Sequence, residues 1–263
     1  MFVEPFFEVG LGGKVRENEG KVIMGTIGWT GNYRFTFEVD HNNALRIISG
    51  INPDASAYTL KKGQVFRTPD FYFTYSENGI GEGSRNFQRW ALNHQLYKGK
   101  EDRLTLLNNW ENTYFDFNEE KELGVDMFLL DDGWFGNKYP RQSDNAGLGD
   151  WDVTKDKLPN GIPYLVKTSN DNGVEFGLWI EPEMVNPKSE LAEKHTDWIL
   201  KLPNRETYYF SNQLDLDMSN PKVQDYVYGV VEKLMTENPK LKFFKWDCNS
   251  PITNIYSYYE KQN

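Results

Sequence analysis

The chain has 263 residues, of which 38% are hydrophobic and 26% are charged, and this balance is that of a folded protein large enough to bury a core. Its formal net charge is −10 and it has no basic stripe, which argues against a nucleic-acid partner because such binding needs clustered Lys and Arg. It also has no apolar run near the ~20 residues that a membrane-spanning helix needs, so we predict no membrane span.

Cysteine content and the opening residues leave the cellular compartment open. Cys248 is the single cysteine, so no intramolecular disulfide can form and no oxidising compartment is indicated. Residues 1–5 do not begin a signal peptide, which favours a cytoplasmic protein or a periplasmic or secreted one whose leader lies upstream. The three histidines lack metal-ligand spacing and no motif implies an organic cofactor, so we predict no metal and no cofactor.

The first ninety or so residues are predicted to form short β-strands. Runs rich in β-branched and aromatic residues alternate with turn signals, and evenly spaced short strands are typical of a β-sandwich. No first strand is obvious at the start of the chain. The glycines of Gly79–Gly83 are interpreted as a boundary, and the spacing of apolar residues predicts a linking helix over Ser84–Tyr97. The predicted strands are Val22–Thr30, Tyr33–Val39, Ala44–Ile48 and Phe71–Tyr75.

From about residue 104 the pattern alternates between strands and helices, which is typical of βα units built on a parallel sheet. Gly173 is the expected stop of the first helix, and Gln213–Leu216 is left open between a short strand and an extended loop. The predicted strands are Leu104–Trp110, Met127–Leu130, Val174–Ile180 and Leu241–Trp246. The predicted helices are Ile162–Asn172, Ser189–His195 and Pro221–Glu237.

Polar or aromatic residues follow four of these predicted strands at the point where each strand ends. In a (β/α)8 barrel the chemistry lies at the carboxyl ends of the strands. This repeated pattern therefore predicts a site there. The residues are Asn109-Trp110, Asp131-Asp132, Glu181 and Asp247.

Five short motifs together resemble those of family 36 glycoside hydrolases, the α-galactosidases or melibiases. They occur in the family's order and cover nearly the whole chain. They are NNWE with YFDFN (108–118), LLDDGWF (129–135), GLGDW with KLPNG (147–161), FGLWIEPEMV (176–185) and KWDCN (245–249).

The resemblance implies a β-sandwich followed by a (β/α)8 TIM barrel and a C-terminal β-domain, so that the chain is an internal fragment. Residues 1–83 would be the end of the N-terminal sandwich, residues 84–103 a linking segment, and residues 104–263 the first half of the catalytic barrel.

The activity implied by the resemblance is hydrolysis of terminal non-reducing α-D-galactosyl residues, in melibiose- or raffinose-type sugars, with retention and with Asp247 as nucleophile. Lys245 lies two residues earlier on a strand and therefore points to the same face, where its charge would lower the pKa of Asp247. From the residues alone, a structural Lys–Asp pair at a strand end explains the spacing equally well.

Asp131 and Asp132 resemble the pair that binds the C4 and C6 hydroxyls of galactose, since carboxylates accept charge-assisted hydrogen bonds. Taken alone, the same residues read as a turn that caps the next helix. Trp179 is the favoured sugar platform and Trp110 the next, although a single Trp is more often part of a core. Asn249 completes the predicted substrate-binding set.

Neighbouring residues receive other assignments. Trp134 and Trp151 are further platform candidates. The resemblance gives Glu181 and Glu183 a supporting role and not that of acid/base. Cys248 is expected to point to the opposite face from Asp247 and to pack there as an unreactive thiol.

Three departures from the family's pattern bear on function. The acid/base Asp is expected in a later strand, beyond Asn263, so the chain alone is expected to have little activity. Ser211 stands where many members have an Arg. The link between Trp110 and Met127 is near the lower limit of about a dozen residues for a crossover between parallel strands, which indicates a missing helix or a minimal connection.

The expected partners are α-galactoside oligosaccharides, and the parent protein is a candidate homo-oligomer. Three alternative functions are open on the sequence alone. They are a raffinose-type galactosyl transferase, an α-N-acetylgalactosaminidase of the same clan, and a non-catalytic sugar-binding fragment.

Overall fold

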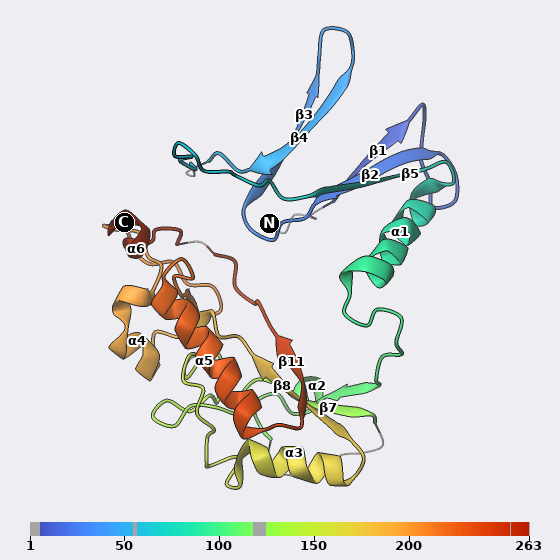
Figure 1. The fold of residues 1–263 in the computed structure, drawn as a ribbon. Helices are drawn as coiled ribbons and strands as arrows, with labels where there is room; N and C mark the ends of the chain where they lie inside the picture. Colours follow the sequence, from blue (N-terminus) through green and yellow to red (C-terminus); the bar gives the residue numbers. More distant parts are fainter. Residues whose placement is uncertain (1–5, 55–56, 118–124, 253, 263) are drawn as a thin grey trace. The chain divides into compact units, whose positions relative to one another are not determined.

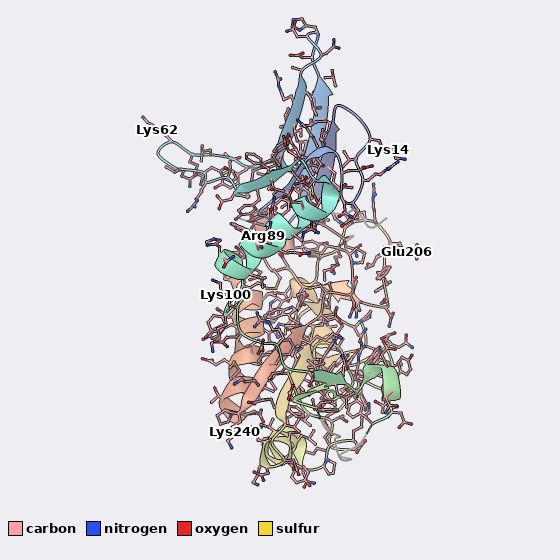
Figure 2. All side chains as sticks on the ribbon, turned by 90° about the vertical axis from the view of Figure 1, so that its right-hand side faces the viewer. Lys14, Lys62, Arg89, Lys100, Glu206 and Lys240 are labelled. Carbon is pink, nitrogen blue, oxygen red and sulfur yellow. The ribbon has the colours of Figure 1, made fainter. Side chains whose placement is uncertain are left out.

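A computed structural model describes residues 6–54, 57–117, 125–252 and 254–262 (Figure 1). The chain divides into two compact units, Met1–Asp102 and Arg103–Asn263. The finer assignment of residues 1–83, 84–103 and 104–263 to three regions stays a prediction. In both units charged side chains such as Lys14, Lys62 and Lys240 are exposed (Figure 2). Among the described residues, no helix has the length and apolar character required to span a bilayer.

The first unit contains two antiparallel β-structures and one α-helix. Its three-stranded sheet has the order β1-β2-β5, and β3 pairs with β4 as a hairpin. The buried apolar residues of this unit are Phe7, Val22, Met24 and Ile27. The elements are β1 (Phe6–Leu11), β2 (Lys21–Ile27), β3 (Tyr33–Val39), β4 (Leu45–Ile51), β5 (Phe71–Ser76), α1 (Gly79–Trp90) and the π-helical turn η1 (Ala91–Gln95).

Two predictions for this unit are wrong. A first strand, β1, exists, and the alternation of buried Phe7 and half-buried Val9 with exposed neighbours is the period-two signal that could have revealed it. The helix predicted over Ser84–Tyr97 begins earlier, at Gly79, and α1 ends at Trp90, before Tyr97. A Cβ at Gly81 would overlap a carboxylate oxygen of Glu17, and one at Gly83 would overlap the sulfur of Met24. These glycines permit close packing of α1 and do not interrupt it.

The second unit is an α/β structure with a four-stranded parallel sheet of order β11-β8-β7-β6. Its strands are β6 (Leu106–Asn108), β7 (Met127–Leu130), β8 (Glu175–Ile180) and β11 (Leu241–Trp246), and a small antiparallel pair is formed by β9 (Met184–Val185) and β10 (Leu214–Asp215). Its helices are α2 (Trp110–Thr113), α3 (Gly161–Asp171), α4 (Glu190–Lys194), the 3-10 turn η2 (Thr196–Trp198), α5 (Pro221–Glu237) and α6 (Tyr258–Gln262).

One buried apolar cluster joins the sheet to α3 and α5. It combines Phe176, Leu178 and Ile180 of β8 with Ile162 of α3 and Val230 of α5. The near-continuous apolar run in β8 is what a parallel strand covered on both faces requires. The predicted alternation of strands and helices is confirmed at this level.

Local signals account for the end of α3 and the start of α5. Gly173 has φ +78° directly after the C-cap of α3, as expected for a left-handed stop. Asn220 caps α5 by accepting a hydrogen bond from the N–H of Lys222, and Pro221 occupies the first turn. The run Leu104–Trp110 is a shorter strand than predicted, because Trp110 already begins α2. The short link between Trp110 and Met127 includes residues 118–124, which lie outside the described residues.

Candidate active site

A polar cavity of 240 Å³ lies beyond the carboxyl ends of β7, β8 and β11. Parallel strands bring these ends to one edge of the sheet, so side chains far apart in sequence meet there. All seven residues singled out from the sequence border this cavity: Trp110, Asp131, Asp132, Trp179, Lys245, Asp247 and Asn249. Four others border it that the sequence did not nominate as ligands: Arg141, Asp144, Ser211 and Gln213.

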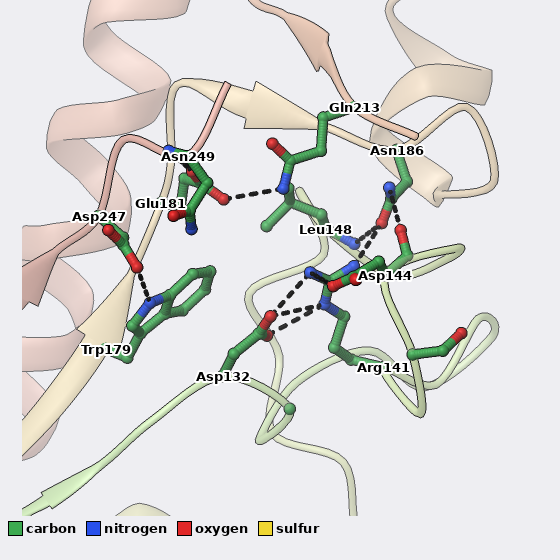
Figure 3. Close-up of polar contacts among 12 residues, drawn as sticks. Asp132, Arg141, Asp144, Leu148, Trp179, Glu181, Asn186, Gln213, Asp247 and Asn249 are labelled. Atoms are coloured by element: carbon green, nitrogen blue, oxygen red, sulfur yellow. Dashed lines mark hydrogen bonds and ion pairs between the residues drawn. The ribbon is translucent and has the colours of Figure 1, made fainter. Parts of the chain in front are cut away.

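Asp247 immediately follows β11 and keeps 29% of its side chain exposed. The indole N–H of Trp179 donates to its Oδ2 at 3.0 Å (Figure 3), and the N–H of Cys248 donates to its Oδ1 at 3.2 Å. Burial alone would raise the pKa of Asp247, but hydrogen bonds from Trp179 and Asn249, together with the charge of Lys245, outweigh it and hold the pKa below its ordinary value. Asp247 is therefore an ionised, partly accessible carboxylate at neutral pH.

Lys245 bridges two carboxylates. Its Nζ lies 2.8 Å from Oδ2 of Asp131 and 3.6 Å from Oδ2 of Asp247. The expected cation beside Asp247 is present, but its closer partner is Asp131, and the Trp179 hydrogen bond lowers the pKa of Asp247 more than the lysine charge does. Lys245 thus ties the ends of β7 and β11 together across the cavity.

Asp131 and Asp132 have different surroundings although they are adjacent. Asp131 accepts from the Asn108 amide at 2.7 Å, and its own N–H donates to Oδ1 of Asn109 at 2.7 Å. Both carboxylates are buried. The next α-helix, α3, begins only at Gly161, so the alternative in which Asp131-Asp132 caps a following helix is wrong.

Arg141 holds Asp132 through a bidentate ion pair. Its Nε lies 3.0 Å from Oδ1 and its Nη2 lies 2.7 Å from Oδ2 (Figure 3). The two side chains are only 1% and 7% exposed. Burial raises the pKa of Asp132, and the guanidinium opposes that rise. Arg141 also donates to Asn186 Oδ1 at 2.9 Å, which fixes the orientation of its guanidinium group against Asp132.

The four tryptophans proposed as sugar platforms differ in their surroundings. Trp134 and Trp151 belong to the buried apolar cluster and are not sugar platforms. Trp179 is 1% exposed, with Phe135 stacked on it at 6.0 Å between ring centroids. Its indole N–H donates to Asp247 and the residue borders the cavity, so its role as a sugar platform stays a prediction. Trp110 is half-buried, makes edge contacts with Tyr114 and Phe115, and is the more open aromatic side chain at the cavity.

Cys248 does not pack inward as expected, because the chain leaves the strand after Trp246. The side chain is exposed, and its sulfur lies 3.1 Å from Oε1 of Glu183. Partial desolvation of the sulfur and the neighbouring Glu183 raise the pKa of the thiol to about 12, so it stays protonated at neutral pH. The expectation of an unreactive thiol fits this environment.

Ser211 borders the cavity in a left-handed conformation, with φ +48°, and Asn212 follows with φ +55°. Within the described ranges, no group of three or more His, Cys, Asp or Glu side chains is arranged to hold a metal ion.

Replacing Trp179 with Phe is expected to raise the pKa of Asp247, because the carboxylate loses its strongest hydrogen-bond donor while its burial, which raises the pKa, is retained. Carboxyl ¹³C titration of Asp247 measures the change. Trp134→Phe is the matched control, since that indole donates to the carbonyl of Trp179 at 3.0 Å and does not touch Asp247. Both variants should lose about 1–3 kcal/mol of unfolding free energy. An unchanged Asp247 titration in Trp179→Phe would contradict the assignment of that hydrogen bond.

Two family models match the chain. The model described as Melibiase matches residues 65–263, and the model described as Glycosyl hydrolase family 36 N-terminal domain matches residues 3–61. Alpha-galactosidase AgaA of Geobacillus stearothermophilus is 40% identical over 258 residues, which are 92% of this chain and 34% of AgaA. Alpha-galactosidase C of Emericella nidulans is 38% identical over 94% of this chain and 35% of its own length.

Solved structures agree with these similarities. The crystal structure of an AgaA variant in complex with raffinose superposes with a TM-score of 0.90 at 38% identity, over 97% of this chain and 36% of that one. The galactosidase domain of alpha-galactosidase-sucrose kinase AgaSK gives a TM-score of 0.87 at 32% identity, over 96% of this chain and 36% of that one. The chain thus spans about a third of the length of the relatives it matches.

Proposed function

The chain belongs to family 36 of the glycosyl hydrolases, and we propose that the full-length protein hydrolyses terminal α-D-galactosyl residues of α-galactosides with retention of configuration. The observation that carries this proposal is Asp247. It is an ionised carboxylate at the end of β11, held by the Trp179 indole and opening onto a polar cavity.

We also propose the finer architecture. The strand order β6-β7-β8-β11, with α3 and α5 in the connections, supports residues 104–263 as the first half of a (β/α)8 barrel. The two antiparallel structures within residues 1–83 support the end of an N-terminal sandwich.

In the proposed mechanism, Asp247 attacks the anomeric carbon as the aglycone leaves, and a galactosyl ester of Asp247 forms. Water then attacks the anomeric carbon and releases galactose with the original configuration. The acid that protonates the leaving oxygen, and later the base that activates water, is expected outside this chain. The ionised state of Asp247 suits the attacking role, because a protonated carboxyl is a poor nucleophile.

Sugar recognition is assigned to the carboxylates at the end of β7 together with Lys245. Asp131 and Asp132 would accept hydrogen bonds from the C4 and C6 hydroxyls, and Lys245, between Asp131 and Asp247, would donate to a hydroxyl near the anomeric end. Asn249 and Trp110 would complete the contacts. Complexes of AgaA variants with raffinose and stachyose support oligosaccharides of this type as substrates.

A panel of aryl glycosides tests the proposed function in the full-length protein. The α-galactoside should be cleaved at least about 100-fold faster, as kcat/KM, than the α-glucoside, because the glucose epimer leaves a buried carboxylate without its axial hydroxyl. Raffinose should yield galactose and sucrose, and ¹H NMR should detect the α-anomer of galactose first. Preference for the N-acetyl-α-galactosaminide, net transfer of galactose to sucrose, or binding without cleavage would each overturn the proposal in favour of a specific alternative.

A further inference from the structure

Glu181 is a buried carboxylate that the proposed mechanism does not use. It follows β8 directly and is 0% exposed. The two cations at the cavity are engaged elsewhere, since Lys245 pairs with Asp131 and Asp247 while Arg141 pairs with Asp132. Burying a carboxylate away from a cation is unfavourable unless its oxygens are hydrogen-bonded, so its contacts indicate what it does.

Both oxygens of Glu181 accept hydrogen bonds from residues that border the cavity. Oε1 accepts from the backbone N–H of Asn249 at 2.6 Å, and Oε2 accepts from the side-chain amide of Gln213 at 3.1 Å (Figure 3). Gln213 is itself 3% exposed. One carboxylate therefore ties the segment after β11 to the segment before β10.

The contact with Asn249 continues the pairing of β8 and β11 past the ends of both strands. The N–H of Asp247 donates to the carbonyl of Ile180 at 2.9 Å, as a ladder bond does. The next N–H on that side belongs to Asn249, and it donates to the Glu181 carboxylate where a ladder bond would have a backbone carbonyl as acceptor. The N–H groups of Asp247 and Asn249 are thus both anchored to β8 or to the residue that follows it. The Asn249 side chain is also one of the donors that lower the pKa of Asp247.

Resting on the proposed function, we infer that Glu181 is a positioning residue: its carboxylate holds Asn249 and Gln213 and thereby fixes the placement of Asp247 in the cavity. It acts through Asn249 and is not assigned any contact with the sugar. A displacement of about 1 Å in an attacking atom lowers a rate by about 100-fold, so this anchoring is expected to affect kcat.

The charge of Glu181 gives this role a pH signature. Burial raises the pKa of Glu181 to about 7, and the negative charges of Glu183, Asp247 and Asp132 add to this rise. The hydrogen bond from the N–H of Asn249 opposes it. The nearby thiol of Cys248 contacts Glu183 and stays protonated, so it adds no charge beside Glu181. Both oxygens of Glu181 accept hydrogen bonds, so protonation below about pH 7 places an O–H against a donor and loosens the anchor. Activity should therefore fall as the pH is lowered through about 7. This fall occurs at a higher pH than the protonation of Asp247, whose pKa is lowered.

Two variants of the full-length protein, assayed on an aryl α-galactoside, test the inference. Glu181→Ala should lower kcat about 100-fold with KM changed less than about twofold, because Asp131, Asp132 and Lys245 are held by other partners and keep their proposed sugar contacts. Glu181→Gln should lower kcat only about 10-fold. The oxygen of the new amide can still accept from the N–H of Asn249, and its NH₂ can donate to the oxygen of a Gln213 side chain that has flipped. In Glu181→Gln the acid limb of the kcat profile should move to lower pH, because the group that titrates near pH 7 is gone.

Glu175→Gln, at the opposite end of β8, is the control that should keep wild-type activity and pH dependence. Thermal melting identifies a variant that fails to fold. If the wild type is active and Glu181→Ala retains its kcat and pH profile, this inference alone is overturned. If the wild type is inactive, the proposed function fails, and ¹⁵N-asparagine labelling still decides the inference. The Asn249 amide signal should titrate near pH 7 in the wild type and not in Glu181→Gln, and a signal that does not titrate overturns it.

Discussion

Asp247→Asn in the full-length protein is expected to lower kcat/KM on α-galactosides by at least about 10⁴-fold. The amide is nearly the same size as the carboxylate, and its oxygen can still accept from the Trp179 indole, so the cavity should keep its shape. What is lost is the nucleophile, because an amide oxygen does not form the galactosyl ester. Initial rates on an aryl α-galactoside and on raffinose measure the effect.

Asp225→Asn is the matched control, since Asp225 is an exposed residue of α5 and the same substitution there should leave the rate unchanged. A smaller residue extends the test. In Asp247→Gly, azide should attack the anomeric carbon from the vacated side, displace the aryl oxide and yield β-galactosyl azide. Asp247→Asn activity close to wild type, or an azide product of α-configuration, would refute Asp247 as the nucleophile.

Arg141→Leu is expected to produce the second large effect, a loss of about 3–5 kcal/mol of unfolding free energy at neutral pH. The substitution leaves Asp132 as a buried carboxylate without its bidentate partner, and it removes the hydrogen bond to Asn186. Denaturant unfolding of the full-length protein measures the loss. The exposed pair of Arg16 with Glu19 supplies the control, because Arg16→Leu should change stability very little.

The pH dependence of this destabilisation has a defined sign. Without Arg141, burial raises the pKa of Asp132 further above its value in the unfolded state. As the pH is lowered, Asp132 is therefore protonated in the folded state before it is protonated in the unfolded state. Stability then falls as pH rises through that window, and the deficit of Arg141→Leu relative to wild type should shrink as the solution is acidified. A deficit that grows on acidification would contradict the unpaired-carboxylate explanation.

A double variant separates stability from recognition. In Arg141→Leu with Asp132→Leu, both partners are replaced by apolar groups, so much of the lost stability should return. Binding of galactose should remain weak, because a predicted acceptor for its hydroxyls is absent. Recovery of both properties together would show that Asp132 has no part in sugar binding.

The sequence by itself determined the central strands of the second unit and the types of residue at their ends. Apolar runs that each end in a polar residue predicted β7, β8 and β11, and they placed Asp131 and Asp247 at one edge of a parallel sheet. The side-chain period of two placed Lys245 on the face of Asp247. These are local properties, since they depend only on neighbouring residues and on the geometry of one strand.

Only the tertiary structure decided how these groups are paired. Trp179 is 68 residues from Asp247, and its role as a donor depends on the register of β8 against β11. Arg141 lies in a loop without periodicity, so no sequence pattern links it to Asp132. The glycines of α1 resemble a helix break in the sequence. They are accommodated in α1 because they allow the close approach of Glu17 and Met24, which lie far away in the chain. Burial and partner choice are set by contacts between distant segments, and those contacts leave no regular spacing in a single sequence.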